Sequence, residues 1–539
     1  MTQLDRRTFI STGAAAFLGA SLVRGPTTLR AEHDLVIRGG NVFDGTGADE
    51  REVDVAITGG RIAEIGPRLS THGRDEIDAR GLAVAPGFID IHSHGDGNLT
   101  EDPRDESVIR QGVTTIVVGA DGSSRATGAA DASFAAYFDS VDHLHPGPNI
   151  AAMVGLGSVR AAVIGEGDRH ATPDELRRMT AMVERALVDG ACGASTGLEY
   201  TPGAFATLDE LVALSRPLAS RRLPYATHMR NEDDRLLDAI DESIAVAAGA
   251  GCPLQISHLK TQGPRNWAKL DTVFSRIASA RAAGTDVAFD RYPYVAYSTG
   301  LTNLFPVWSR DGGIDAFLAR LADPSLAPRI KQEALAKVAL IGGWDNVQVS
   351  SVRAAEDGDA DGKRLGAHAT ARGIDPFDDT VALLRRSHGA VGMLGFAMSE
   401  DNLDRILAHP LAMVCSDGGG FAIDGPTRTG SPHPRGIGTF PRVLGRYVRE
   451  RKALSLADAI RKMTSAPAAR VRLADRGRLE RGLAGDVVVF DPAHVADTAT
   501  FASPFQYPVG ISAVIVNGSV ALRDGHRATV GGGHALRAT

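Results

Sequence analysis

Short apolar runs alternate with amphipathic stretches through the middle of the chain, from about residue 87 to residue 469. The runs have the length of buried strands, whereas the stretches between them, such as 174–187 and 235–248, space their apolar residues as helices do. The runs that predict strands are 88–94, 114–119, 150–155, 191–196, 224–228, 254–258, 285–290 and 411–417. Eight strand–helix alternations predict a parallel (β/α)8 barrel of the TIM type, whose catalytic groups lie at the carboxyl ends of the strands.

Both ends of the chain show a different pattern, in which short alternating strands are joined by glycine turns. We expect residues 32–86 and 470–539 to form one small β-sandwich domain beside a barrel domain of residues 87–469. The gap before the last barrel strand is too long for one helix. Residues 300–366 are therefore expected to form a helical insertion over the barrel mouth.

The first 31 residues are predicted to be a twin-arginine-type signal peptide. Arg6 and Arg7 precede a small apolar run at 11–23, as in signals that export folded proteins. The run is short and rich in glycine and alanine for a membrane span, although an uncleaved N-terminal anchor is the alternative. We expect a periplasmic or secreted protein with no stable membrane association after the signal is removed.

Composition narrows the class of protein. The formal net charge is -7, and no lysine- and arginine-rich stripe with interleaved aromatic residues is present, so nucleic acid is not an expected partner. The three cysteines, Cys192, Cys252 and Cys415, form no Cys-x-x-Cys pair. We expect each to be a small buried apolar residue, not part of a disulfide framework or a metal ligand.

Histidines and aspartates stand at the carboxyl ends of several predicted strands. They are His92 and His94 after the first strand, Asp121 after the second, His228 at the fifth, His258 at the sixth and Asp417 at the eighth. In a strand, the His-x-His spacing puts both imidazoles on one side. Since these strand ends meet at one rim of a barrel, the residues are predicted to converge on a metal site.

Imidazole nitrogens and carboxylate oxygens are the usual ligands of zinc, and a catalytic zinc keeps one position open for water. Bound zinc lowers the pKa of that water toward ~7. Asp417 would accept the proton of the attacking water and pass it to the leaving amine. Its alternative roles are those of a plain metal ligand or a strand-end cap. The pattern predicts a metal-dependent hydrolase.

Several longer motifs carry a family resemblance. They are Phe88-Ile-Asp-Ile-His-Ser-His94, Ser195-Thr-Gly-Leu-Glu-Tyr-Thr-Pro-Gly203, Thr227-His-Met-Arg-Asn-Glu232, Ile256-Ser-His-Leu-Lys260, Asp290-Arg-Tyr-Pro-Tyr294, Ser416-Asp-Gly418, His433-Pro-Arg435, Gly438-Thr-Phe-Pro-Arg-Val-Leu-Gly-Arg-Tyr447 and Lys462-Met-Thr-Ser-Ala-Pro467. Together they resemble the N-acyl-D-amino acid deacylases, or D-aminoacylases, of the amidohydrolase superfamily. The resemblance extends from Asp34 to the C-terminus.

The resemblance implies hydrolysis of the linear amide of a small N-acyl-D-amino acid, giving a D-amino acid and a carboxylate. It implies that His228 and His258 hold a tightly bound zinc ion, and that His92 and His94 form a second, weakly occupied site. It also implies that Asp417 is the catalytic acid and base. Substrate would be bound by Lys260, which matches the family's carboxylate-binding lysine, and by Tyr200, Tyr292 and Arg435. For the two tyrosines, core packing is the alternative, and for Lys260 a solvated position at the rim.

One residue departs from the family pattern. Gly119-Ala-Asp-Gly122 replaces Gly-Asn-Cys-Gly, so that Asp121 stands where the family has a thiolate ligand. A carboxylate is a harder ligand than a thiolate, so the site would hold zinc less tightly or accept manganese or cobalt more readily. Two other hypotheses stay open. One is a catalytically silent, ligand-binding member of the family, and the other is a cyclic-amide hydrolase resembling hydantoinases and dihydroorotases. That group usually bridges its metals with a lysine on a strand, whereas the one lysine at a predicted strand end, Lys260, lies beyond its histidine.

Overall fold

The computed structural model describes residues 32–127, 133–528 and 531–538. The predicted signal peptide, residues 1–31, lies outside the described residues. No helix in the described part of the chain is both long enough and apolar enough to cross a membrane. Cys192, Cys252 and Cys415 are free and buried, as the sequence predicts.

A closed parallel barrel forms the centre of the molecule. Its strands are β6 (Phe88–Asp90), β7 (Val113–Val118), β8 (Asn149–Ala152) with β9 (Val154–Gly155), β10 (Ala194–Gly197), β11 (Tyr225–His228), β12 (Leu254–Ile256), β13 (Val287–Arg291) and β17 (Ala412–Val414). Each pairs in parallel with the next, and β8 and β9 are two halves of one strand that kinks at Met153. The barrel closes where the amide of Asp417 donates to the carbonyl of His92 at 2.9 Å. The predicted (β/α)8 fold is confirmed.

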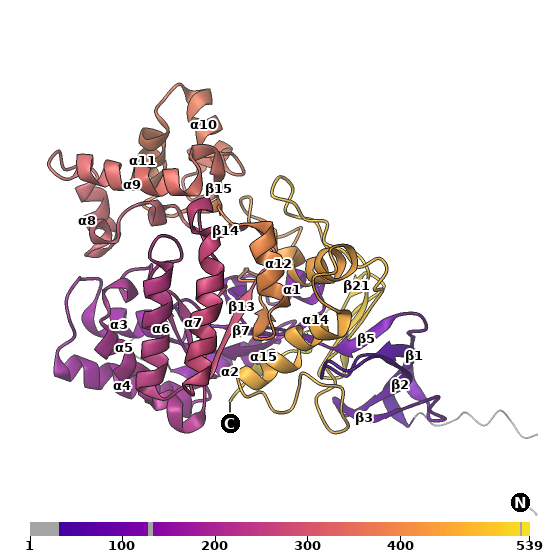
Figure 1. Ribbon diagram of the computed structural model, residues 1–539. Coiled ribbons are helices and arrows are strands. Elements are labelled where there is room, and N and C mark those ends of the chain that lie inside the picture. Colours follow the sequence, from indigo (N-terminus) through magenta and orange to yellow (C-terminus); the bar gives the residue numbers. More distant parts are fainter. Residues whose placement is uncertain (1–31, 128–132, 529–530, 539) are drawn as a thin grey trace, which may run out of the picture.

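Helices surround the barrel. They are α1 (Glu106–Ile109), α2 (Phe134–Leu144), α3 (Leu156–Ile164), α4 (Pro173–Val188), α5 (Leu208–Ser215), α6 (Leu236–Ala250), α7 (Leu270–Ala282), α12 (Glu400–Ala408), α13 (Arg435–Arg442), α14 (Leu456–Met463) and α15 (Ser465–Arg470). Helix α4 shows how the sequence specifies them, since Thr172 and Glu175 form a capping box around Pro173 at its first position. Helices α6 and α7 run side by side along one flank (Figure 1).

Strands from both ends of the chain build one nine-stranded sheet beside the barrel. They are β1 (His33–Val42), β2 (Arg51–Thr58), β3 (Arg61–Gly66), β4 (Gly73–Asp78), β5 (Ala83–Pro86), β18 (Val487–Phe490), β19 (Ile511–Val516), β20 (Ser519–Arg523) and β21 (His526–Arg527). The antiparallel pair β5–β18 joins the two halves. Side chains of β1–β4, such as Ile37 and Ile57, share a core with Val489 and Ile515 from β18 and β19, so the sheet encloses its own apolar face. The last strand, β22 (Ala535–Leu536), instead pairs with β8 of the barrel.

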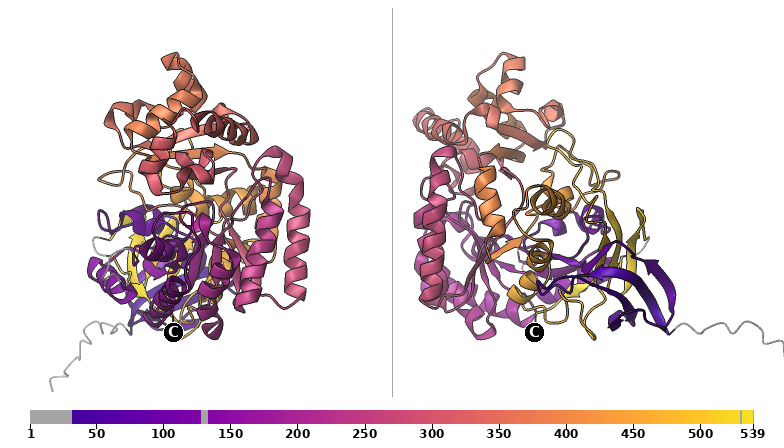
Figure 2. Two further views of the ribbon diagram at one scale, coloured as in Figure 1. Left: turned by 90° about the vertical axis from the view of Figure 1, so that its left-hand side faces the viewer. Right: turned by 45° about the vertical axis from the view of Figure 1, so that its right-hand side comes forward.

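The insertion over the barrel mouth is larger than the sequence indicates. It contains β14 (Ala296–Gly300), α8 (Gly313–Arg320), α9 (Ala327–Ile341), β15 (Val347–Val352), α10 (Leu365–Arg372), α11 (Pro376–Arg386) and β16 (Val391–Phe396). The predicted range 300–366 is therefore too short, because β16 lies between β14 and β15 in a three-stranded antiparallel sheet and closes the unit only near residue 396. Figure 2 shows the insertion as a separate layer above the barrel.

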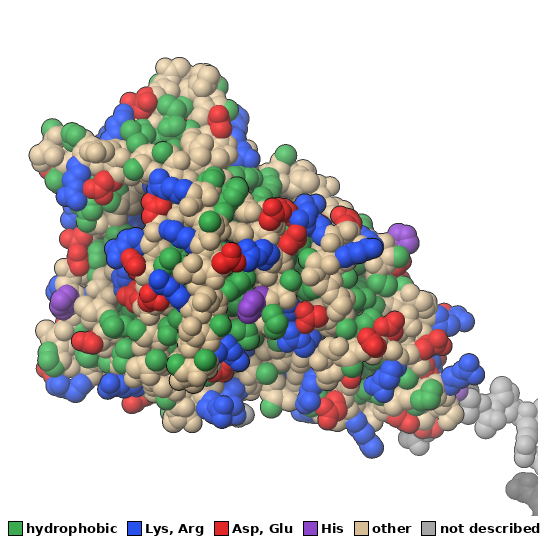
Figure 3. Space-filling model, in the orientation of Figure 1, with side chains coloured by type: hydrophobic (Ala, Val, Ile, Leu, Met, Phe, Trp, Pro, Cys, Tyr) green, Lys and Arg blue, Asp and Glu red, His purple; other side chains and the backbone are tan. Residues whose placement is uncertain are grey.

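On the face of the molecule shown in Figure 3, lysine and arginine side chains are interspersed with aspartate and glutamate over the barrel helices and the insertion. The charges that matter for chemistry lie instead below the insertion, at the carboxyl ends of the barrel strands.

Candidate metal centre

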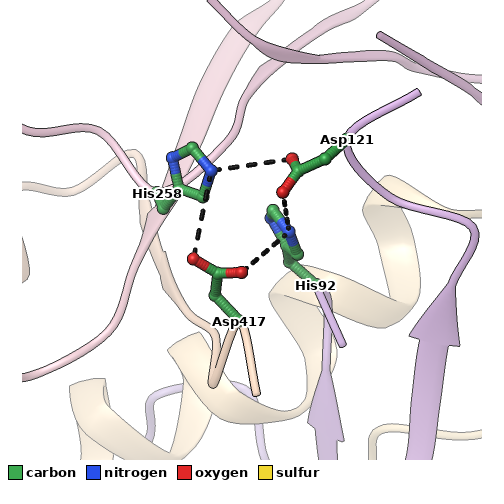
Figure 4. A group of neighbouring side chains, drawn as sticks. All are labelled: His92, Asp121, His258 and Asp417. Atoms are coloured by element: carbon green, nitrogen blue, oxygen red, sulfur yellow. Dashed lines mark ion pairs between the residues drawn. The ribbon is translucent and has the colours of Figure 1, made fainter. Parts of the chain in front are cut away.

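The predicted ligands converge at one rim of the barrel. His92 and His94 follow β6, Asp121 follows β7, His228 ends β11, His258 lies just beyond β12, and Asp417 lies just beyond β17. Figure 4 shows His92, Asp121, His258 and Asp417 pointing toward one another from four different strands. The structure thus brings together all of the residues that the strand-end pattern singles out.

Two carboxylates lie between two pairs of histidines. Asp121 Oδ2 is 3.4 Å from Nε2 of both His92 and His94, while Asp417 Oδ1 is 3.5 Å and 3.2 Å from the same two nitrogens. On the other side, His258 Nε2 is 3.6 Å from Asp121 Oδ1 and 4.0 Å from Asp417 Oδ2. His228 Nδ1 lies 3.0 Å from His258 Nε2 and 4.0 Å from Asp121 Oδ2. Asp121 therefore contacts all four histidines.

These distances suit a metal ion. Zinc holds nitrogen and oxygen ligands at about 2.0–2.2 Å in a tetrahedron, which places neighbouring ligand atoms roughly 3.3–3.6 Å apart. Ligand atoms of His92, Asp121, His258 and Asp417 all lie within 4.8 Å of one another. His92 Nε2 and Asp121 Oδ1 are buried and have no hydrogen-bond partner among the described residues. Since a buried polar atom without a partner costs free energy, these atoms fit a divalent cation as their missing partner.

The outer nitrogens of three histidines face carboxylates. His92 Nδ1 is 3.6 Å from Asp290 Oδ1, and His258 Nδ1 is 3.1 Å from Glu232 Oε1. His228 Nε2 is 3.5 Å from Glu199 Oε2. Carboxylates in this position fix the orientation of metal-binding imidazoles and make them stronger ligands.

Sequence reasoning did not single out these three carboxylates. Asp290 is the last residue of a predicted strand, Glu199 lies two residues beyond β10, and Glu232 lies four residues beyond His228. Asp290 could have been found in the sequence from its place at the carboxyl end of a predicted strand. Glu199 and Glu232 act through histidines of other strands, and only the folded chain shows those contacts.

Unusual backbone conformations aim three of these candidate site residues. Asp121, His258 and Asp417 have positive φ angles of 52°, 35° and 49°. Such angles are uncommon in residues other than glycine and cluster at functional sites, where the surrounding structure enforces them. At His258 the enforcing contact is a hydrogen bond of 2.7 Å from its amide to Asp290 Oδ1. The strand ends are therefore bent so that these side chains turn into the barrel mouth.

Comparison with known proteins decides the family. Residues 75–522 match the family model described as "Amidohydrolase family". The chain belongs to the amidohydrolase family.

Relatives of known activity cover nearly the whole of this amidohydrolase. It is 38% identical to an N-acyl-D-glutamate deacylase and 36% identical to a D-aminoacylase, both from Alcaligenes xylosoxydans xylosoxydans. Each alignment covers 90% of this chain, and 93% or 94% of the relative. Among solved structures, an N-acyl-D-glutamate deacylase of Bordetella bronchiseptica, in complex with zinc and a phosphonate inhibitor, superposes with a TM-score of 0.80. It is 35% identical, and the match covers 94% of this chain and 100% of that chain. Within the amidohydrolases, the chain therefore belongs with the N-acyl-D-amino acid deacylases.

The amidohydrolase carries a cavity of about 470 Å³ above the candidate metal ligands. Lys260, Tyr200, Tyr292 and Arg435, which the sequence analysis assigns to substrate, all line it. Residues 297–300 and Asn303 of the insertion form its outer wall. The insertion therefore shapes the space that a substrate would occupy.

Two of these lining groups are already paired. Lys260 Nζ donates to Glu232 Oε1 at 2.6 Å and lies 2.7 Å from His258 Nδ1, so it is neither free nor solvated. Arg435 Nη1 donates to Asp417 Oδ2 at 2.7 Å. Tyr200 and Tyr292 differ from each other: the Tyr200 hydroxyl lies 3.1 Å from Thr299 Oγ1, and the Tyr292 hydroxyl is buried without a partner among the described residues.

The electrostatics of the site keep both central carboxylates ionised. Burial alone would raise the pKa of Asp121, but the charges of His92 and His258 outweigh it and hold the pKa well below its usual value. For Asp417, burial is likewise outweighed by Arg435 and by the histidines, which lower its pKa. Both side chains are therefore present as carboxylates at neutral pH, the form that binds a cation and accepts a proton.

Proposed function

We propose that this amidohydrolase hydrolyses the linear amide bond of N-acyl-D-amino acids, releasing a D-amino acid and a carboxylate. The observation that carries the proposal is the convergence of His92, Asp121, His258 and Asp417 below a cavity of about 470 Å³. The relatives named as deacylases of N-acyl-D-amino acids align over 90% of the chain.

The metal-binding residues would be His92, His94, Asp121, His228 and His258. Zinc held there would supply Lewis-acid activation of the attacking water and of the amide carbonyl. We propose one tightly held zinc ion at His228 and His258 and weaker occupancy beside His92 and His94. A D-aminoacylase of known structure, which superposes with a TM-score of 0.78 at 34% identity, is described as having a binuclear metal centre. Asp121 would contribute oxygen to both positions because it contacts both pairs of histidines.

Asp417 is the proposed acid and base. Its carboxylate is ionised, faces the cavity and lies among the metal-binding residues. It would accept the proton of the attacking water at one oxygen and then donate that proton to the nitrogen of the departing amine. The hydrogen bond from Arg435 to Oδ2 fixes the carboxylate, while Oδ1 stays oriented toward His92 and His94.

Cations and hydroxyls are placed to bind the substrate. The α-carboxylate of an N-acyl-D-amino acid needs a cationic partner. Two cationic side chains that line the cavity, Lys260 and Arg435, would supply it. The unpartnered hydroxyl of Tyr292 would donate a hydrogen bond to the bound substrate. The insertion covers the site and would keep bulk water away from it.

A cyclic-amide substrate has less support. The hydantoinase-type relatives, such as a dihydropyrimidinase of Brevibacillus agri NCHU1002, superpose with a TM-score of 0.57 at 17% identity, which shows a shared fold alone. Among the described residues, Lys260 is the lysine that lines the cavity, and it is engaged by Glu232.

The test compares enantiomers on one purified preparation. We expect free amino acid to be released from N-acetyl-D-amino acids, with little release from the L enantiomers, and activity to be lost with a chelator and restored by zinc. Equal rates on both enantiomers would contradict the stereochemical assignment. Bound metal without turnover on any N-acyl-amino acid would favour the silent, ligand-binding alternative.

We further propose that the first 31 residues export the folded protein through a twin-arginine pathway. Replacing Arg6 and Arg7 by lysine should retain the protein in the cytoplasmic fraction, whereas the unaltered chain should be recovered from the periplasm. Export of the double variant at the normal level would contradict the proposal.

A further inference from the structure

His433 is a buried histidine whose role the proposed function leaves open. It is 4% exposed and lies two residues before Arg435, with which α13 begins. It does not line the cavity of about 470 Å³, and among the described residues it belongs to none of the groups that could hold a metal ion. Both of its ring nitrogens nevertheless have partners, and these connect His433 to the site.

Two backbone groups fix the hydrogen-bonding state of the His433 ring. Nδ1 accepts a hydrogen bond of 3.0 Å from the amide of Arg435, and Nε2 lies 3.0 Å from the carbonyl oxygen of Ala296. Since an amide only donates and a carbonyl only accepts, Nδ1 carries no proton and Nε2 carries one. The imidazole is therefore neutral. Burial and the charge of Arg435 act in the same direction, because both lower the pKa of His433, which lies well below its usual value.

The two partners of His433 belong to different parts of the molecule. Ala296 is the first residue of β14 in the insertion, and Arg435 is the first residue of α13 beside the barrel. A helix begins with amides that have no partner inside the helix, so the ring satisfies one of them at a buried position. The rings of Phe501 and Tyr294 hold the imidazole from the side, in edge-to-face contacts with centroid distances of 5.0 Å and 5.1 Å. His433 thus joins β14 to the start of α13.

The position of α13 matters because Arg435 contacts the proposed acid and base. Its Nη1 donates to Asp417 Oδ2 at 2.7 Å, and its Nη2 lies 3.5 Å from the carbonyl oxygen of Ser298 in β14. The guanidinium also lies over the ring of Tyr292, 4.8 Å from its centroid. Strand β14 therefore holds Arg435 in two ways, at the guanidinium through Ser298 and at the backbone through His433.

We propose that His433 is a positioning residue for the hydrolytic reaction, because it joins the start of α13 to β14 and so holds Arg435 against Asp417. The inference rests on the proposed deacylase function. In that function Arg435 has two tasks, which are to fix the carboxylate of Asp417 and to bind the α-carboxylate of the substrate. Both tasks depend on where α13 begins, and displacing a positioned group by about 1 Å lowers a rate by as much as about 10²-fold.

The first experiment separates this role from a general loss of stability. The longer side chain in His433→Gln no longer places an acceptor at Nδ1, and we expect kcat/KM of the zinc-loaded enzyme on its best N-acetyl-D-amino acid to fall at least about tenfold. The matched control is His368→Gln in α10, because His368 is also buried, at 1% exposed, and its Nδ1 faces Asp379. The control should lower Tm but leave kcat/KM within about twofold. Equal losses of kcat/KM in the two variants would overturn the inference.

A conservative variant tests the hydrogen bond itself. The side-chain oxygen of asparagine can take the place of Nδ1 as the acceptor for the Arg435 amide. His433→Asn should therefore keep a higher kcat/KM than His433→Gln. A value no higher than that of the Gln variant would show that this hydrogen bond does not carry the effect, and the inference would be wrong.

A double-mutant cycle tests whether His433 acts through Arg435. Arg435→Lys keeps a cation but loses the planar fork that reaches Asp417 and Ser298 at once. In this background, His433→Gln should lower kcat/KM by less than about threefold. A loss of about tenfold in both backgrounds would show that His433 acts independently of Arg435, against the inference.

Hydrogen exchange of the metal-free protein supplies a readout that needs no turnover. The amides of residues 435–438 should exchange faster in His433→Gln than in the parent protein and should be unchanged in His368→Gln, because His433 contacts the start of α13 and His368 does not. Unchanged exchange in His433→Gln would refute the inference even in an active enzyme. A parent protein that hydrolyses none of a broad panel of N-acetyl-D-amino acids would instead refute the proposed function, and with it the role in hydrolysis that we assign to His433.

Discussion

At the scale of single residues, Asp417 carries the chemistry that we propose. Asp417→Asn keeps the shape of the side chain but removes the group that accepts and returns a proton. We expect kcat to fall by about 10²–10⁴-fold, measured on the best N-acetyl-D-amino acid, while zinc content stays near that of the parent protein. Asp424→Asn is a matched control, because Asp424 is 75% exposed in the same segment. A rate within about twofold of the parent would refute the assigned role of Asp417.

We expect Asp121 to set the metal preference of the site. Asp121→Cys introduces the thiolate that the resemblance leads one to expect at this position, and soft thiolates favour zinc over manganese. We expect the ratio of zinc to manganese affinity, measured by chelator competition, to rise at least about tenfold. The positive φ of residue 121 will oppose this gain, since cysteine tolerates that conformation less well than aspartate. A lower zinc preference in the cysteine variant would contradict the view that Asp121 is a metal ligand.

The residues that sequence alone could assign are those whose chemistry follows from their place on a strand. His228 and Asp417 stand out because a parallel barrel brings every strand end to one rim, whatever the loops do. Glu199 and Glu232 could not be assigned in this way. Their roles depend on which imidazole each one faces, and that is fixed by side-chain packing between different strands.

At the scale of elements, the insertion is tied to the barrel by a partly buried ion pair. Lys337 of α9 contacts Asp233, which follows β11, at 2.6 Å, with side chains 18% and 7% exposed. Lys337→Met leaves the Asp233 carboxylate without its cation, and removing one partner of such a charged hydrogen bond costs about 1–3 kcal/mol. We expect a lower Tm and faster hydrogen exchange in α9.

The same helix supplies the control for this prediction. Lys331 is 40% exposed and pairs with Asp375 near the surface, so Lys331→Met should change stability by less than about 1 kcal/mol. Equal loss of Tm in the two variants would show that the contact with Asp233 has no special role.

The insertion also shows where element prediction fails. Its helices α8 and α9 lie within residues 300–366, the range that the sequence predicts to be a helical insertion. The C-terminal boundary of the insertion, near residue 396, does not follow from local periodicity, because β16 is recognisable only through its pairing with β14 and β15. The two-residue strand β22 was missed for the same reason, since it is defined solely by its pairing with β8. Short strands are specified by distant partners more than by their own sequence.

At the scale of the whole molecule, metal binding should be coupled to stability and pH. Burial lowers the pKa of His94, but hydrogen bonds and charge from Asp121 and Asp417 outweigh it and raise the pKa from 6.5 to about 9 in the metal-free site. A pKa that is raised in the folded state contributes stability that is fully present below pH 6.5 and is lost as the pH rises through about 9. We therefore expect the Tm of the metal-free protein to decrease as the pH is raised from 6.5 to about 9.

The zinc-loaded protein should respond differently. Zinc requires neutral imidazole, so its binding displaces the proton from His94, and the affinity for zinc should increase as the pH rises toward about 9. The difference in Tm between loaded and metal-free protein should therefore widen over the same window, because ligand stabilisation grows with affinity. Thermal unfolding of both forms at fixed zinc concentration measures this difference. His94→Asn should flatten its pH dependence, whereas His494→Asn, which alters a histidine that is 79% exposed and pairs with Asp491, should leave it unchanged. A difference that is constant with pH in the parent protein would show that His94 carries no proton for zinc to displace.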